Sequence, residues 1–210
     1  NLFDPTFLEN ISKMKEKNLA VEMLKKLIDE QVKVYKRTNL VKSEAFSELI
    51  QQTLNRYLNG MLTNEEVIQE LLNLAKAMLH ASEEGNELGL TDEELAFYDA
   101  LTKPEAVKDF YSNEDLIALT KELTETLRKN KTIDWQKKES ARAKMRMIVK
   151  KLLKKYKYPP EGQEDALKTV ISQCELWTDN VADYEDTVSY SINDVYGTLK
   201  VAETTSDNGK

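Results

Sequence analysis

Apolar residues recur at intervals of three and four positions along most of this chain, and this spacing places them on one side of an α-helix. Leu116, Leu119 and Leu123 form one such series, and comparable series occur up to about residue 180. Six Gly and four Pro among 210 residues leave few positions at which a helix must end. The sequence therefore predicts an all-α fold, an irregular multi-helix bundle whose 40% hydrophobic content is enough for a sizeable core.

Helix-start signals punctuate the apolar series. Asp4 precedes Pro5, which suits the first helical turn, and Thr63 and Thr91 each open a capping box that ends in a Glu three positions later. We also predict that Ser43 caps the helix that carries Phe46 and that ends at Asn59-Gly60. Short connections between these series indicate antiparallel neighbours.

The periodicity divides the chain into three expected parts. A lead-in helix occupies residues 1–17, a helical domain residues 18–183 and a C-terminal extension residues 184–210. We predict that the polar extension is partly disordered, and the alternation over residues 187–192 leaves open a short strand or an irregular segment. Because the chain begins at Asn1, we expect it to be a fragment or a processed product.

One segment, residues 128–158, holds an excess of positive charge. It carries thirteen Lys and Arg residues against Asp134 and Glu139, which gives it a net charge of about +11. Because the whole chain has a net charge of −7, the remaining residues sum to about −18. Such separation of charge predicts a surface that meets an acidic partner.

The basic segment has the pattern of a long amphipathic helix. Asp134 is its expected N-cap and Pro159-Pro160 its expected stop, while Met147 falls among the cations. The other interpretation is a solvated face whose cations suit the helix dipole. Trp135 and Tyr156 are expected to be packing anchors. The expected apolar stripe consists of Ala141, Met145, Ile148, Val149, Leu152 and Tyr156.

The residues offer no catalytic, cofactor or metal site. His80 is the single histidine and Cys174 the single cysteine, so neither a metal cluster nor a nucleophile with its base can be assembled around them. We expect Cys174 to lie in the core. The sequence lacks the phosphate-binding glycine motifs, a signal peptide and any apolar run long enough to span a membrane, so a cytoplasmic protein is expected.

Three separated blocks resemble a known family. They are the Arg37-Thr38-Asn39 group through Leu49, residues 88–101 (LGLTDEELAFYDAL), and residues 132–160, which run from Thr132-Ile133-Asp134-Trp135 to Tyr158-Pro159-Pro160. In this order they resemble the C-terminal helical region of the R subunits of type I restriction-modification enzymes. The resemblance covers about residues 17 to 165.

The resemblance implies that the chain is one piece of a large subunit. The other parts of that subunit include a nuclease domain and two RecA-like motor domains, which use ATP and Mg²⁺. In the family, the C-terminal helical region helps to dock the R subunit onto the methyltransferase core of modification and specificity subunits. We therefore expect an assembly domain with no enzymatic activity and no cofactor of its own.

The expected partners are the methyltransferase core and the rest of the R subunit, without a membrane. The alternative is a helical module that contacts DNA phosphates without reading bases; the overall acidity and the few aromatic residues near the cations argue against it. The same side chains serve both hypotheses. The predicted partner-binding residues are Arg142, Lys144, Arg146, Lys150, Lys151, Lys154 and Lys155.

Overall fold

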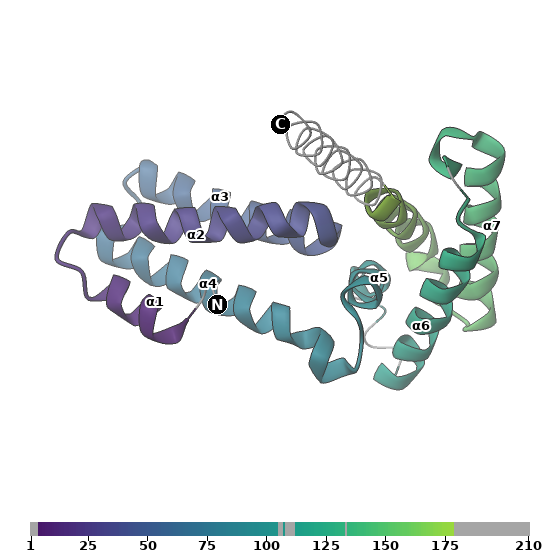
Figure 1. The fold of residues 1–210 in the computed structure, drawn as a ribbon. Helices are drawn as coiled ribbons and strands as arrows, with labels where there is room; N and C mark the ends of the chain where they lie inside the picture. Colours follow the sequence, from purple (N-terminus) through teal and green to yellow (C-terminus); the bar gives the residue numbers. More distant parts are fainter. Residues whose placement is uncertain (1–3, 105–106, 108–111, 133, 179–210) are drawn as a thin grey trace, which may run out of the picture.

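The computed structural model describes residues 4–104, 107, 112–132 and 134–178 (Figure 1). These residues are mostly helical and contain no strand, which confirms the predicted all-α class. The predictions for residues 184–210 lie outside the described residues. The helices are α1 (Pro5–Ser12), α2 (Lys17–Thr38), α3 (Leu40–Leu58), α4 (Asn64–Leu88), α5 (Asp92–Thr102), α6 (Asn113–Asn130) and α7 (Glu139–Lys155), followed by a helix over residues 160–178.

The first four helices enclose one hydrophobic cluster. α2, α3 and α4 pack side by side, and α1 lies against α2 and α4 (Figure 1). The rings of Tyr35 and Phe46 stack with their centroids 5.7 Å apart, which joins α2 to α3. Burial of these apolar faces is what stabilises the arrangement. The cluster includes Leu8, Ile11, Leu24, Ile28, Val67, Leu71 and Met78.

Local capping fixes most of the helix starts, as predicted. Asp4 accepts hydrogen bonds from the backbone of Thr6 and Phe7, and Thr63 and Thr91 each form a complete capping box. The prediction for Ser43 is wrong. Asn39 caps α3 instead, by accepting a hydrogen bond from the backbone N–H of Lys42, and Ser43 is a buried residue one turn later.

Gly89 follows the last residue of α4 and has a left-handed backbone conformation. Its φ is 64°, and the backbone N–H of Leu90 then donates to the carbonyl of Gly85 at 2.8 Å. Glycine adopts this conformation without steric cost, so the chain turns sharply into α5.

The later helices enclose a second hydrophobic cluster. It contains side chains from α5, α6, α7 and the helix over residues 160–178, and Trp135 and Tyr158 are among its largest fully buried members. The Tyr158 hydroxyl donates to the carbonyl of Leu101 at 2.5 Å, which ties the segment after α7 to α5. Cys174 is buried here, as expected. Other members are Phe97, Leu101, Leu116, Leu119, Leu123, Val149 and Val170.

Polar side chains that are buried or largely buried join the two clusters, and we call Asn39, Lys42, Asp99 and Gln173 the polar joint. Asn39 Nδ2 donates to Asp99 Oδ2 at 2.6 Å, and Lys42 Nζ lies 3.5 Å from the same oxygen. Lys42 Nζ also lies 3.2 Å from Glu84 Oε2. Burial raises the pKa of Asp99 above its ordinary value, against the opposing effect of Lys42.

Gln173 makes the hydrogen bonds of the polar joint that connect the residues furthest apart in the sequence. Its Oε1 accepts from the backbone N–H of Leu40 at 2.8 Å, and its Nε2 donates to the carbonyl of Thr38 at 2.9 Å. The last described helix thus holds the turn between α2 and α3. Whether residues 18–183 act as one domain, as predicted, stays a prediction.

Candidate interaction surface

A buried tryptophan sets the start of the basic helix α7. Trp135 is fully buried, and its Nε1 donates to Thr178 Oγ1 at 3.0 Å. Residues Trp135–Lys137 therefore form a short 3₁₀ turn, and α7 begins only at Glu139. The prediction that Asp134 caps this helix is wrong, because Asp134 precedes the 3₁₀ turn with a φ of 56°. Lys138 occupies the N-cap position without a side-chain hydrogen bond.

The end of α7 is also fixed before the two prolines. Lys157 has a φ of 55°, and the backbone N–H of Tyr158 donates to the carbonyl of Leu153 at 2.8 Å. This is the Schellman arrangement, here built on a lysine where glycine is usual. The helix therefore ends at Lys155, and Pro160 opens the next helix.

The predicted apolar stripe of α7 faces the second cluster. Met145, Val149 and Leu152 are buried as predicted, and Leu153, which the stripe omitted, is buried with them. The remaining stripe residues are half-buried against the same cluster; they are Ala141, Ile148 and Tyr156.

Three of the seven predicted partner-binding cations have carboxylate partners. Arg142 Nη2 lies 3.0 Å from Glu175 Oε1, and Arg146 Nη1 lies 2.9 Å from Glu139 Oε1. Lys155 Nζ contacts both carboxylate oxygens of Glu122, at 2.6 and 2.7 Å. The hydrogen bonds from Lys155 and Tyr156 hold the pKa of Glu122 below its ordinary value.

The other four cations form an exposed set, which we call the lysine ridge: Lys144, Lys150, Lys151 and Lys154. Each is exposed, and none forms an ion pair within the part of the chain that the structure describes. At about 100° per residue they span an arc of about 120° on α7. Met147 lies inside that arc and is 58% exposed. The ridge is therefore a cationic strip with one large apolar side chain in its middle.

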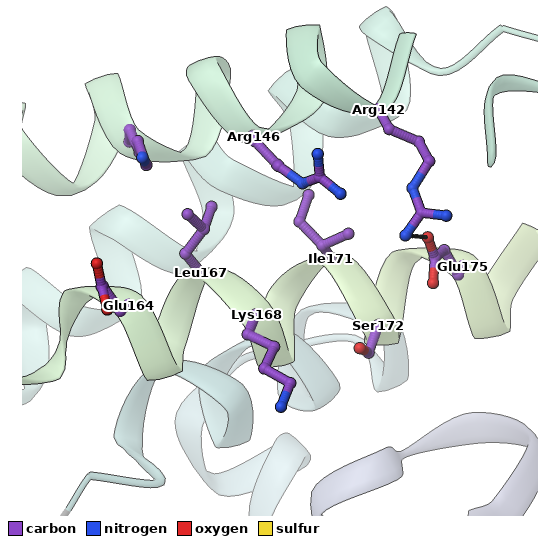
Figure 2. A pocket seen from close by; sticks show the side chains of 9 residues that line it. Arg142, Arg146, Glu164, Leu167, Lys168, Ile171, Ser172 and Glu175 are labelled. Carbon is purple, nitrogen blue, oxygen red and sulfur yellow. Dashed lines mark ion pairs between the residues drawn. The ribbon is translucent and has the colours of Figure 1, made fainter. Parts of the chain in front are cut away.

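A groove runs between α7 and the helix over residues 160–178, beside the lysine ridge (Figure 2). Its volume is about 400 Å³. Sequence reasoning missed its second wall, because nothing local indicates that the 160–178 helix lies beside α7. The groove is lined by Arg142, Arg146, Lys150, Glu164, Leu167, Lys168, Ile171, Ser172 and Glu175.

The described residues offer no site for metal or thiol chemistry. They contain no group of three His, Cys, Asp or Glu side chains that could hold a metal ion. Burial raises the pKa of the Cys174 thiol to about 12, so it stays protonated at neutral pH. His80 is exposed on α4. None of the described helices has the length and apolar character needed to cross a membrane.

Comparisons with known proteins agree on one family. A family model described as "Type I restriction enzyme HindI endonuclease subunit-like, C-terminal" matches residues 1–180. The type I restriction enzyme HindI endonuclease subunit of Haemophilus influenzae is 42% identical over 175 residues, which cover 83% of this chain and 17% of that protein.

A second relative comes from Methanocaldococcus jannaschii. It is the provisionally named type I restriction enzyme MjaIXP endonuclease subunit, 34% identical over 150 residues that cover 71% of this chain and 14% of the relative. The chain thus spans about one sixth of the length of the curated relatives it matches. No solved structure matches it. The chain belongs to the family of C-terminal regions of type I restriction enzyme endonuclease subunits that resemble the HindI subunit.

Proposed function

We propose that this chain docks an endonuclease subunit onto the methyltransferase core of a type I restriction enzyme, through the lysine ridge. The core consists of modification and specificity subunits. Cleavage and DNA translocation, with their ATP and Mg²⁺, belong in this proposal to other parts of a longer cytoplasmic subunit, and the chain itself has no enzymatic activity.

The observation that carries the proposal is the set of four exposed lysines without a described carboxylate partner. Their charges act on a partner rather than on a neighbouring helix, and complementary charge speeds association and fixes orientation. Met147 adds an adaptable apolar side chain at the centre of the same surface. A charged rim around an apolar centre is the usual anatomy of a protein interface.

The competing function is contact with DNA phosphates by the same lysines. A linear cationic strip suits a phosphate backbone, and binding of that kind falls steeply with salt. Aromatic side chains that stack on bases would strengthen this reading, but Trp135 and Tyr158 are fully buried and Tyr156 is half-buried. The exposed Met147 also fits a protein better than a phosphate backbone.

Charge reversal tests the proposal. Changing Lys144, Lys150, Lys151 and Lys154 to Glu should weaken binding to the methyltransferase core about ten- to a hundredfold at low salt, measured by titration calorimetry. The matched control reverses four exposed lysines within the first 76 residues, outside the basic segment, and changes the net charge equally; they are Lys15, Lys26, Lys36 and Lys76. Binding by the control should stay within about threefold of the original chain.

The same titrations distinguish the two functions. Each is run with the core alone, with a short DNA duplex alone and with both, at two salt concentrations. The proposal is supported if the original chain binds the core in the absence of the duplex and the ridge variant does not. Equal losses in both variants, or a ridge variant that binds as the original chain does, would contradict it. Binding to the duplex alone with a steep salt dependence would establish the competing function.

A further inference from the structure

The groove between α7 and the 160–178 helix has a cationic wall on its α7 side. Arg142, Arg146 and Lys150 follow one another at intervals of four residues, about 6 Å along the helix axis. Figure 2 shows the guanidinium groups of Arg142 and Arg146 extending from α7 toward the facing helix. This wall differs from the lysine ridge and shares only Lys150 with it.

The floor of the groove is apolar. Leu167 is half-buried and Ile171 is 5% exposed, and both project from the facing helix toward α7 (Figure 2). A volume of about 400 Å³ accommodates a row of side chains rather than a complete helix. An occupant therefore lies along the groove and inserts one apolar row.

The carboxylates of the groove lie toward its two ends. Glu164 is near one end of the groove, and Glu175 pairs with Arg142 at the other end (Figure 2). Arg146, between them, pairs with Glu139 of its own helix, and the Glu139 side chain is 77% exposed. The middle of the groove thus combines an apolar floor with a cation whose present partner is a solvated surface carboxylate.

The Arg142–Glu175 pair is incompletely satisfied. Arg142 Nη2 and Glu175 Oε1 are 3.0 Å apart, but without the alignment of a hydrogen bond. Among the residues that the structure describes, the buried atoms Arg142 Nε and Glu175 Oε1 have no hydrogen-bond partner. Replacing such a pair costs less than breaking a fully hydrogen-bonded one, so an incoming carboxylate can compete for Arg142.

We infer that this groove binds an acidic amphipathic α-helix of the methyltransferase core. An α-helix places carboxylates four residues apart at the same 6 Å spacing as Arg142, Arg146 and Lys150, about one turn each. Its apolar residues at the adjoining positions cover Leu167 and Ile171. The apolar floor favours this occupant over DNA, because it gives phosphates nothing to bind and matches the apolar side of a helix. The inference rests on the proposed function, because it names the part of the core that docks.

Three variants test the groove separately from the ridge. Leu167→Asp should weaken binding of the 210-residue chain to the methyltransferase core about tenfold or more at both low and high salt, because the lost contact is apolar. Arg146→Glu should weaken it mainly at low salt. Lys76→Glu is the control, because Lys76 is an exposed lysine of α4 that does not line the groove, and the affinity of this variant should change less than about threefold.

Two further measurements keep the test decisive. Circular dichroism reports whether Leu167→Asp keeps its helices. If that variant is unfolded, the milder change Leu167→Ala replaces it and should also weaken binding to the core. Ser172→Cys with a photoreactive maleimide places a cross-linker at the groove, beside the single and buried Cys174. The inference expects cross-links to an acidic helical segment of the core.

Each outcome decides the matter. If the ridge variant loses the core while the groove variants keep it, the inference fails and the proposed function stands. If the original chain does not bind the core at all, both fail. Cross-links only to a non-acidic segment, or groove variants that lose a DNA duplex but keep the core, would also overturn the inference.

Discussion

Asn39 donates a hydrogen bond to Asp99 across 2.6 Å, and this bond connects the start of α3 to α5. Asn39 also caps α3, so one side chain both begins a helix and joins the two hydrophobic clusters. The polar joint around it decides how the helices that carry the lysine ridge and groove are held against α2, α3 and α4.

Gln173→Ala should lower the free energy of unfolding by about 1–3 kcal/mol, because two partly buried backbone groups, the Thr38 carbonyl and the Leu40 N–H, lose their partner. Chemical denaturation measures this loss. Hydrogen exchange at the Leu40 amide should also become faster. Gln52→Ala removes an exposed glutamine of α3 and serves as the control. Equal stability of the two variants would refute the role assigned to Gln173.

Lys42→Met should destabilise the protein by about 3 kcal/mol, because it leaves the buried Asp99 carboxylate without its cation. Thermal unfolding at neutral pH measures the effect. Lys33→Met, which removes an exposed lysine paired with Glu30, should leave the free energy of unfolding nearly unchanged. A neutral result for Lys42→Met would mean that Asp99 is already uncharged at neutral pH.

Asp99→Asn should change the pH dependence of stability in a specific direction. The folded-state pKa of Asp99 is raised above 3.8, so in the pH range just above 3.8 the folded chain binds more protons at this site than the unfolded chain. The Asp99 contribution to stability therefore falls as the pH rises through that range. We expect the stability of the original chain minus that of Asp99→Asn to fall with rising pH there. A difference that grows would contradict the raised pKa.

Thr91→Ala should cost about 1 kcal/mol, because α5 loses the oxygen that accepts from the backbone N–H of Glu94. The double variant Thr91→Ala, Glu94→Ala should cost less than the sum of the two single changes, since both belong to one capping box. Thr126→Ala, within α6, controls for the loss of a threonine. Denaturation curves of the four proteins give the coupling, and strict additivity would argue against the box.

The helices could be predicted from the sequence because their signals are local. The series in α6 and the capping boxes at Thr63 and Thr91 involve residues within a few positions of one another, and each corresponds to a helix in the structure. The prediction for Ser43 failed because a tertiary contact decides that start: Asn39 is held by Asp99, 60 residues away.

The candidate site was only half predictable for the same reason. The amphipathic pattern identified the cations of α7, but it could not show which of them meet carboxylates. Glu175 and Glu122 reach Arg142 and Lys155 from other helices, 33 residues away in each case. The start of α7 at Glu139 likewise depends on the burial of Trp135.

The contact between Gln173 and Leu40 spans 133 residues and sets an order of events during synthesis. The ribosome makes the chain from its N-terminus, so α1 to α4 are complete and able to pack long before residue 173 leaves the exit tunnel. Until then the Leu40 amide and the Thr38 carbonyl have only water as a partner. The last described helix therefore completes the contacts between the two clusters. The basic helix reaches its final orientation only when translation of this region is nearly finished.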